Sequence, residues 1–295
     1  MSLNVIDGRQ LAERLVEEMA EEVKTRTALG YQRPGLAVVL VGEDPASAIY
    51  VRNKIRTAEK AGLHSVVTHL DASCSQQALD DIVTDLNERD DIDGILVQLP
   101  LPAHLSEERI INLITPEKDV DGFHPMNVGQ LATGQAYLVP CTPLGCLEIL
   151  KREVGDLSGK HAVVVGRSNI VGKPMASMLL QANCTVTVVH SKTVDAVSLC
   201  KQADILVAAV GVPELLDSAW VKPGAVVLDV GINAIEKDGK RKLVGDVNFA
   251  DVADICKAIT PVPGGIGPMT IACLIKNTLV AAKQRGVKQP VVKAR

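Results

Sequence analysis

The sequence predicts an α/β protein of two domains, each built on a parallel sheet. A chain of 295 residues is long enough for two domains, each with its own core. Hydrophobic residues make up 47% of the chain and aromatic residues only 2%, so the core must consist of Val, Leu, Ile and Ala, as parallel sheets prefer. Short apolar runs also alternate with segments of helical periodicity, which is the pattern of repeated βα units.

The composition excludes two classes of partner. The chain has 31 Lys and Arg against 35 Asp and Glu, without a long basic cluster, so we expect no nucleic acid partner. No apolar run approaches the roughly 18 residues that a membrane span needs, and residues 1–9 lack a signal-peptide pattern. We therefore expect a cytoplasmic protein without a membrane partner.

The seven cysteines are scattered without Cys-x-x-Cys pairs or a neighbouring histidine cluster. Their spacing does not match the ligand pattern of closed zinc sites. We expect buried, reduced thiols and no metal.

Three βα repeats are expected in the first half of the chain. The segments are a helix through Leu11, Leu15, Met19 and Val23, a strand at 36–41, a helix from Pro45 to Gly62, a strand at 65–70, a helix through Leu79, Ile82, Val83 and Leu86, and a strand at 94–99.

Details of these segments indicate how they are oriented. In the second helix Pro45 suits the first turn, and Ile49, Ile55 and Ala58 are expected to face inward. Pro100 and Pro102 end the third strand. Right-handed crossovers place helices on both faces of the sheet and bring the strand ends, including Gly42 and Gln98, to one open edge.

The domain boundary is expected near residue 140. Residues 115–134 are rich in turn formers, and Thr142-Pro143 then caps a helix that runs through Lys151. A second strand series follows at 162–165, 185–189, 205–210 and 226–230, and the helix at 269–284 is apolar on nearly all faces, which predicts burial. We expect one domain of residues 1–140 with the C-terminal helix 269–295, a second domain of residues 141–268, and a cleft between them.

The turn after the first strand of the second domain is suited to a phosphate. It reads Gly166-Arg167-Ser168-Asn169-Ile170-Val171-Gly172 and opens a helix, whose free N–H groups and positive dipole end attract an anion. Ser168 stands where the usual dinucleotide fingerprint has its second glycine. The second domain is therefore predicted to be a Rossmann-like dinucleotide-binding domain.

The end of the next strand favours NADP over NAD. NAD enzymes place an acidic residue there to bind the ribose 2′-hydroxyl, whereas this chain has His190-Ser191-Lys192-Thr193. Arg167, Ser191 and Lys192 instead offer positive charge and hydrogen-bond donors to a 2′-phosphate.

Polar residues gather at positions typical of a catalytic site in the first domain. Tyr50 and Lys54 lie four residues apart and project from one face of a helix, and Gln98 leaves a strand just before Pro100. Asp119, Asp121 and His124 stand in a loop punctuated by Gly and Pro, where we expect His124 to have a structural role. A second loop at 260–270 holds three glycines and three prolines and forms a shaped backbone surface.

At these residues the chain resembles the bacterial methylenetetrahydrofolate dehydrogenase/cyclohydrolase family over almost its whole length. The signatures that carry the resemblance are Tyr50-Val51-Arg52-Asn53-Lys54, Gly94-Ile95-Leu96-Val97-Gln98-Leu99-Pro100-Leu101-Pro102, Lys118-Asp119-Val120-Asp121-Gly122-Phe123, Gly166-Arg167-Ser168 and the loop from Pro261 to Thr270.

The resemblance implies two reactions in one site, the NADP-dependent oxidation of 5,10-methylenetetrahydrofolate to the methenyl cation and its hydrolysis to 10-formyltetrahydrofolate. It implies that Lys54 is the catalytic group, that Tyr50 stacks on or orients the folate, that Gln98 hydrogen-bonds Lys54, and that Asp121 grips the pterin. A lysine can take this role if a dry cleft and the cationic substrate favour its neutral amine.

The resemblance also implies the binding residues and a homodimer. Substrate contacts are expected at Tyr50, Asp121, Pro263, Gly264 and Gly265. Cofactor contacts are expected at Gly166, Arg167, Ser168, Gly172, Ser191 and Ile232.

Two alternative functions stay open at the level of sequence. The first is a monofunctional dehydrogenase, against which Lys54 argues because the hydrolytic step needs it. The second is a degenerate module that binds NADP or folate without chemistry, and such a protein would be expected to lose Lys54, Gln98 or Asp121.

Overall fold

The computed structural model describes residues 5–237 and 239–286, and their contacts divide the chain into two compact units. One unit contains Glu13–Cys141 together with the chain from Ile271 onward, and we call it the three-stranded unit after its sheet. The other contains the chain through Ala12 together with Thr142–Thr270, and we call it the five-stranded unit. Both sheets are parallel, so the predicted α/β fold class is confirmed.

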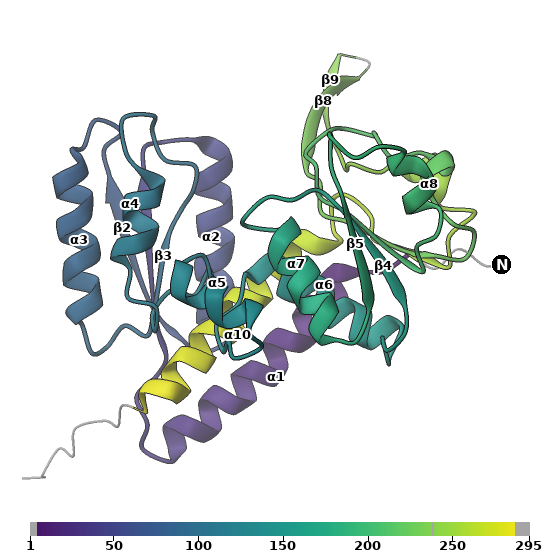
Figure 1. Ribbon diagram of the computed structural model, residues 1–295. Helices are drawn as coiled ribbons and strands as arrows, with labels where there is room; N and C mark the ends of the chain where they lie inside the picture. Colours follow the sequence, from purple (N-terminus) through teal and green to yellow (C-terminus); the bar gives the residue numbers. More distant parts are fainter. Residues whose placement is uncertain (1–4, 238, 287–295) are drawn as a thin grey trace, which may run out of the picture. The chain divides into compact units, whose positions relative to one another are not determined.

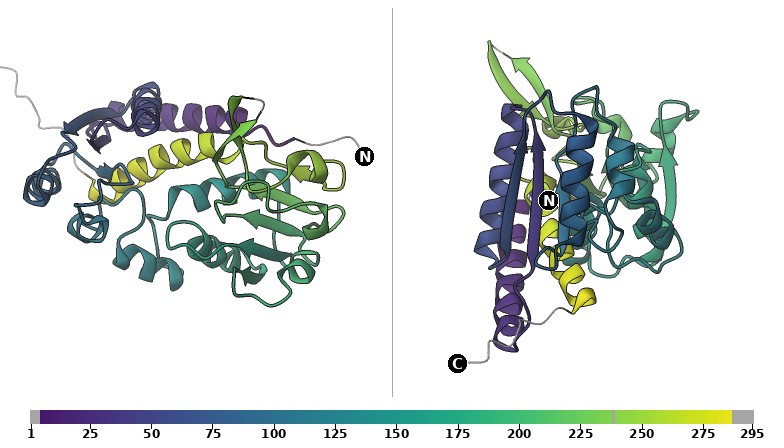
Figure 2. Two further views of the ribbon diagram at one scale, coloured as in Figure 1. Left: turned by 90° about the horizontal axis from the view of Figure 1, so that it is seen from above. Right: turned by 90° about the vertical axis from the view of Figure 1, so that its left-hand side faces the viewer.

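The sheet of the three-stranded unit has the order β2-β1-β3, with helices on both faces (Figures 1 and 2). Its elements are β1 (Gly35–Val41), α2 (Pro45–Lys60), β2 (His64–Leu70), α3 (Gln76–Glu88), β3 (Gly94–Val97) and α4 (Glu107–Leu113). Every residue of the central strand β1 is buried, and α3 and α4 pack on one face through Val83 and Ile110. The predicted order of strands and helices from residue 35 to residue 97 is confirmed.

Helix α2 begins where the sequence predicts, but it faces another way. The Asp44 side chain accepts a hydrogen bond of 2.7 Å from the Ser47 amide and caps the helix, which starts at Pro45. Ile49 is 55% exposed, so its predicted inward orientation is wrong. The buried side of the helix instead contains Lys54 and Ala58, which are four residues apart. Ile49 precedes Lys54 by five residues, and because one turn takes 3.6 residues, the two side chains point to different sides of the helix.

Two long helices run side by side in the three-stranded unit (Figures 1 and 2). They are the parts of α1 (Gly8–Ala28) and α10 (Ile266–Arg285) that belong to this unit. Lys283 forms an ion pair with Glu22, and the Arg26 guanidinium donates to the Ala282 carbonyl at 3.3 Å. Buried residues lie on nearly every turn of α10, as its uniform apolarity predicts.

Residues 115–134 are rich in turn formers, and within them lies a helix that the sequence does not predict, α5 (Pro125–Ala132). Pro125 occupies the first turn, and the His124 Nδ1 accepts a hydrogen bond of 3.1 Å from the Met126 amide. The predicted structural role of His124 is therefore confirmed. The helix is too short for its periodicity to stand out among the turn formers.

The sheet of the five-stranded unit has the order β10-β7-β6-β4-β5. Its strands are β4 (His161–Val165), β5 (Thr185–Val189), β6 (Ile205–Ala208), β7 (Val226–Asp229) and β10 (Ala258–Ile259). The helices of this unit are α6 (Cys141–Glu153), α7 (Gly172–Gln181), α8 (Ala196–Cys200), the 3₁₀-helix η1 (Ser218–Trp220) and α9 (Phe249–Val252). A separate antiparallel hairpin consists of β8 (Asn233–Lys237) and β9 (Lys240–Val244). The four predicted strands are confirmed within two residues. The hairpin and β10 are additions to the predicted fold.

Three properties of the described residues bear on function. No helix among residues 5–237 and 239–286 is long and apolar enough to span a membrane. The same residues contain no group of three or more His, Cys, Asp or Glu that could hold a metal ion. All seven cysteines are free thiols, and all but Cys74 are buried.

Candidate active site

Lys54 and Gln98 form a hydrogen-bonded pair in the three-stranded unit. The Lys54 Nζ donates to the Gln98 Oε1 at 2.9 Å, and Lys54 is only 9% exposed. The Gln98 Nε2 donates at 2.6 Å to the carbonyl of Leu99, which orients the amide so that its oxygen faces the lysine. Since an amide carries no net charge, Gln98 holds the lysine without forming an ion pair with it.

Tyr50 lies one turn before Lys54 on α2, so the two side chains project from the same side of the helix. Its side chain is 37% exposed, and desolvation raises the pKa of its hydroxyl above the ordinary value. Tyr50 therefore presents a partly exposed ring next to the lysine, and such a ring can stack on a flat ligand.

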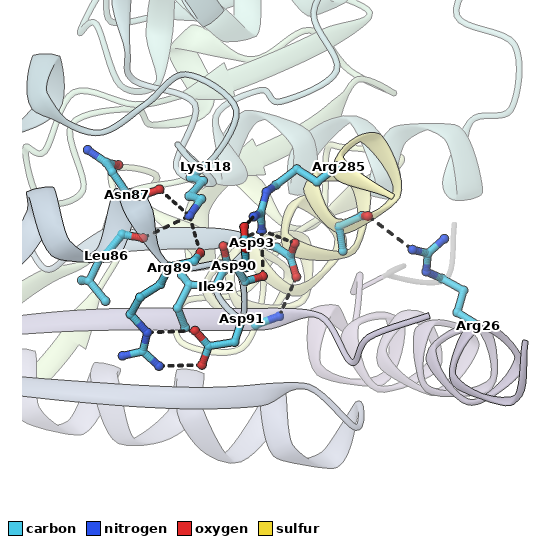
Figure 3. A network of polar contacts seen from close by, with 12 residues as sticks. Arg26, Leu86, Asn87, Arg89, Asp90, Asp91, Ile92, Asp93, Lys118 and Arg285 are labelled. Atoms are coloured by element: carbon cyan, nitrogen blue, oxygen red, sulfur yellow. Dashed lines mark hydrogen bonds and ion pairs between the residues drawn. The ribbon is translucent and has the colours of Figure 1, made fainter. Parts of the chain in front are cut away.

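The loop that carries Asp121 is anchored at its first residue by a buried lysine (Figure 3). Lys118 is 4% exposed, and its Nζ donates to three carbonyls at the end of α3, those of Leu86 at 3.1 Å and of Asn87 and Arg89 at 2.7 Å. Desolvation lowers the pKa of Lys118 to about 8. Its amine is fully used as a helix cap, so we assign it a structural role.

The second loop residue, Asp119, is also a structural anchor. Its carboxylate accepts hydrogen bonds from the amides of Gly122 at 3.1 Å and His124 at 2.7 Å, and from the Asn127 Nδ2 at 2.9 Å. Asp119 is 3% exposed, and desolvation raises its pKa. These bonds close the turn around Asp121 and tie it to α5.

Asp121 differs from its neighbour Asp119 because, within the described residues, no hydrogen bond or ion pair holds its carboxylate. It lines a small cavity of about 10 Å³ together with apolar residues such as Val97, Leu99 and Phe123. Desolvation raises the pKa of Asp121 to about 6, against the opposing effect of the Lys54 charge. Lys54, Gln98 and Asp121 thus belong to one group of interacting side chains, which we call the Lys54 group.

The turn from Gly166 to Gly172 in the five-stranded unit has the form of a phosphate-binding turn. Gly166 has a φ of +120°, and a Cβ atom there would collide with the Ala209 carbonyl. A Cβ atom on Gly172, the first residue of α7, would collide with the Gly166 carbonyl. The Ser168 Oγ accepts from the amides of Val171 at 3.2 Å and Gly172 at 3.3 Å, which lie at the start of the helix. Both glycines are therefore required by close packing.

Arg167 is exposed, and no hydrogen bond or ion pair joins its side chain to any part of the chain that the structure describes. Ser191 and Lys192, in the turn after β5, are exposed as well, and the Lys192 amide donates to the His190 Nδ1 at 3.2 Å. Two of these three side chains carry positive charge, and the segment 190–193 contains no carboxylate. The arrangement fits a phosphate ligand.

Sequence reasoning missed two buried carboxylates beside Ile232 in the five-stranded unit. Asp229 accepts hydrogen bonds from the amides of Gly231 at 3.0 Å, Asp246 at 2.9 Å and Val247 at 2.9 Å. Desolvation raises the pKa of Asp229 to about 6. Asp246 in turn accepts from the amides of residues 210 and 211 at 2.7 and 2.9 Å and from the side chain of residue 233 at 2.9 Å.

The two carboxylates fix the loops that follow β6, β7 and β9. Ile232 lies in the second of these loops, and it is 48% exposed. Asp229 ends a buried strand, and a carboxylate directly after Val226–Leu228 is the signal that could have revealed it.

The loop at residues 261–265 is tightly packed within the five-stranded unit. Gly264 has a φ of +106°, and Gly265 is buried against Thr260 and Gly8, where added Cβ atoms would collide with the backbone. Pro263 is exposed. The glycines thus have a packing reason for their presence.

Two family models match the chain over most of its length. The catalytic domain of tetrahydrofolate dehydrogenase/cyclohydrolase matches residues 6–121, and the NAD(P)-binding domain of the same enzymes matches residues 140–286. The Lys54 group falls within the first match, and the turn at Gly166 falls within the second.

Full-length relatives agree with these matches. The chain is 56% identical to the "Bifunctional protein FolD 2" of Pseudomonas savastanoi pv. phaseolicola, over 98% of this chain and 96% of that protein, and 57% identical to the "Bifunctional protein FolD" of Dichelobacter nodosus, over 96% and 98%.

Solved structures give the same result. The FolD methylenetetrahydrofolate dehydrogenase/cyclohydrolase of Campylobacter jejuni superimposes with a TM-score of 0.91 at 47% identity, covering 96% of this chain and all of that one. The Trypanosoma brucei enzyme, solved with NADP cofactor and an inhibitor, has a TM-score of 0.91 at 39% identity, covering 97% and 99%. The chain therefore belongs to the tetrahydrofolate dehydrogenase/cyclohydrolase family.

Proposed function

We propose that this protein oxidises 5,10-methylenetetrahydrofolate with NADP to 5,10-methenyltetrahydrofolate and hydrolyses that product to 10-formyltetrahydrofolate in one site. The observation that carries the proposal is the Lys54 group, in which a buried lysine is oriented by the neutral Gln98 beside the carboxylate of Asp121. A degenerate binding module would not need this arrangement. The bifunctional relatives support the same function.

We assign the two activities to parts of the chain as follows. Residues 1–140 and the C-terminal helix 269–295 form the folate-binding catalytic domain, and residues 141–268 form the NADP-binding domain. The positions of the Lys54 group and of the Gly166 turn in separate units support the assignment. Residues 5–12, however, pack within the five-stranded unit, where the Ile6 amide donates to the Ile259 carbonyl at 2.9 Å.

Asp121 and Tyr50 hold the folate in this proposal. The ionised carboxylate of Asp121 accepts two parallel N–H donors from the aminopyrimidine edge of the pterin, while the exposed ring of Tyr50 stacks on or orients the folate. The exposed Pro263 and the adjoining Gly264 and Gly265 supply further folate contacts in this proposal. Holding the substrate carbon in position is the main requirement for its oxidation.

Lys54 acts in the hydrolytic step. When water attacks the methenyl carbon, the unprotonated amine of Lys54 accepts a proton from it, and Gln98 keeps the Nζ atom in place through its 2.9 Å hydrogen bond. The hydrated intermediate then opens: its C–N5 bond breaks, N5 takes up a proton, and the hydroxyl group loses its proton to become the carbonyl of the formyl group on N10. Gln98 suits this role because its amide oxygen orients the Nζ atom without forming an ion pair with it.

The residues of the five-stranded unit fit NADP. The glycine-lined turn allows the backbone to approach a pyrophosphate, and the exposed Arg167, Ser191 and Lys192 offer donors for a 2′-phosphate. Gly166, Ser168, Gly172 and Ile232 complete the proposed contacts. When bound, NADP accepts the hydride that leaves the substrate carbon.

Arg167→Ala is expected to weaken NADP binding while NAD binding stays almost unchanged. Loss of a charge-assisted contact to the 2′-phosphate costs about 1.5–3 kcal/mol, or roughly 10- to 150-fold in Kd. Titration calorimetry with both dinucleotides measures the effect, and Lys201→Ala, at the exposed residue directly after α8, is the control. Equal weakening of NADP and NAD would refute the role of Arg167.

Folate affinity is expected to fall as the pH drops below 6. The pKa of Asp121 is about 6, and only the ionised carboxylate accepts two N–H bonds, so Kd rises about tenfold for each pH unit below that value. The test is to measure tetrahydrofolate binding between pH 5 and 8. NADP is kept saturating, because Asp229 in the NADP-binding unit also has a pKa of about 6 and its titration must not change the amount of bound NADP. An unchanged profile in Asp121→Asn would contradict the assignment.

One assay tests the proposed function as a whole. The purified chain is incubated with 5,10-methylenetetrahydrofolate and either NADP or NAD, and reduced dinucleotide, methenyltetrahydrofolate and 10-formyltetrahydrofolate are followed together. We expect rapid NADPH formation, later 10-formyl product and slower reaction with NAD. NADPH formation without any acceleration of methenyl hydrolysis would identify a monofunctional dehydrogenase, and neither activity would identify a binding module.

We also propose that the protein is a cytoplasmic homodimer, as the resemblance implies. β5 lies at the edge of its sheet, and Val188 on this strand and Leu180 on α7 are 37% and 64% exposed, which supports an interaction between copies. The free thiols support a reducing compartment. Sedimentation velocity should give twice the mass of the chain, and a single-chain mass at micromolar concentration would rule the homodimer out.

A further inference from the structure

Asn277, on α10, is a buried polar residue that the proposed mechanism does not use. It is 1% exposed, and its Nδ2 donates at 2.8 Å to the carbonyl of Val120 and at 2.8 Å to that of Val139. Burying an amide in an apolar helix is unfavourable unless it makes such bonds. Both donor hydrogens of this side chain are thus used on the backbone of other segments.

One of these two carbonyls belongs to the peptide bond that leads into Asp121. Val120 also accepts a hydrogen bond of 3.2 Å from the Cys141 Sγ, which lies 3.6 Å from the Asn277 Nδ2. Because a peptide group is planar, fixing the Val120 carbonyl fixes the amide nitrogen of Asp121 as well. The backbone nitrogen and the Cα atom of Asp121, from which its side chain starts, are therefore held from α10.

The second carbonyl bound by Asn277 lies behind the same loop. Gly122 has a φ of +72°, and a Cβ atom there would collide with the backbone of Val139 and Pro140. The loop thus packs directly on residues 139–140. Asn277 hydrogen-bonds both segments, the loop at Val120 and the segment 139–140 at Val139. Among the described residues, no other side chain hydrogen-bonds both the Val120 and the Val139 carbonyl.

We propose that Asn277 is a positioning residue for folate binding, which fixes the Val120–Asp121 peptide and so aims the Asp121 carboxylate at the pterin. The inference rests on the proposed function. Lys118 and Asp119 anchor the start of the loop and Asn277 anchors the residue directly before Asp121. Asn277 touches no reacting atom and acts only through the carboxylate.

The test measures tetrahydrofolate binding to the full chain with NADP saturating. Asn277→Ala is expected to raise the Kd for tetrahydrofolate about tenfold or more, since both bonds that orient the peptide are lost, while the Kd for NADP changes less than about twofold. Thr278→Ala is the matched control. Thr278 is the next residue of α10, is fully buried, and bonds only the Leu274 carbonyl of its own helix at 2.9 Å.

A double-mutant cycle separates positioning from a general structural role. If Asn277 acts through Asp121, Asn277→Ala has no further effect on tetrahydrofolate binding in the Asp121→Ala background. Additive effects, or an equal loss in Thr278→Ala, would overturn the inference. If Asn277→Ala fails to fold, Cys141→Ala removes the second donor to Val120 and should raise the same Kd several-fold, and an unchanged Kd would overturn the inference.

The outcome for the wild-type chain keeps the two proposals distinct. A wild-type chain that does not bind tetrahydrofolate would refute the proposed function, and this inference with it. A wild-type chain that binds tetrahydrofolate, together with an Asn277→Ala variant of equal affinity, would refute the positioning role alone.

Discussion

Replacing Lys54 with methionine is expected to lower the hydrolysis of methenyltetrahydrofolate by about 10²–10⁴-fold, the usual size of general acid–base assistance, while part of the dehydrogenase activity persists. Water needs a proton acceptor when it attacks, whereas loss of the hydride is assisted mainly by the lone pair of the substrate nitrogen. Methionine keeps the length of the buried side chain and removes its basicity. Methenyltetrahydrofolate should therefore accumulate during turnover.

This comparison is made at saturating substrate, because methionine could also disturb folate placement. Unchanged NADP binding verifies the fold, and Lys60→Met, at the exposed end of the same helix, is the matched control. Undiminished methenyl hydrolysis in Lys54→Met would show that another group accepts the proton.

The second large effect is expected at Asp121. Asp121→Ala should impair both activities by weakening substrate binding, because both reactions use the same bound pterin. Loss of a hydrogen-bonding carboxylate costs about 1.5–3 kcal/mol, which corresponds to roughly 10- to 150-fold in KM for the folate. NADP affinity should stay nearly intact, since Asp121 and the Gly166 turn belong to different units.

Steady-state kinetics of both reactions and calorimetry with NADP provide the measurement. Asp85→Ala, which removes an exposed carboxylate from α3, is the control. If either activity survived with an unchanged KM, Asp121 would not be the residue that grips the pterin.

The sequence predicts the sheets well because a strand that is buried on both faces consists of a continuous run of apolar residues. The apolar runs at Leu36–Val41 and Ala162–Val165 correspond to fully buried strands, and the strand ends bring Gly42 and Gln98 to the edge where Gln98 meets Lys54. The Tyr50 and Lys54 pair could also be predicted, because residues four apart share a helix face wherever the helix packs.

The orientation of the helices and the contacts between distant parts of the chain are harder to predict from the sequence. The inward prediction for Ile49 failed because hydrophobicity alone does not say which stripe of a helix is buried, and the stripe here includes the charged Lys54. Helix α5 was hidden among turn formers. The bond from Asn277 to Val120 joins residues 157 positions apart, and no spacing rule reports on such a pair.

The claim that both activities use one site around Lys54 is tested most directly by inhibition with tetrahydrofolate. Its inhibition constant is measured against methylenetetrahydrofolate oxidation with NADP saturating, and then against methenyltetrahydrofolate hydrolysis under the same conditions. One shared site predicts competitive inhibition of both reactions with equal constants, and both constants should rise together in Asp121→Ala. Different constants, or a rise in only one of them, would show that the two reactions occur at separate sites.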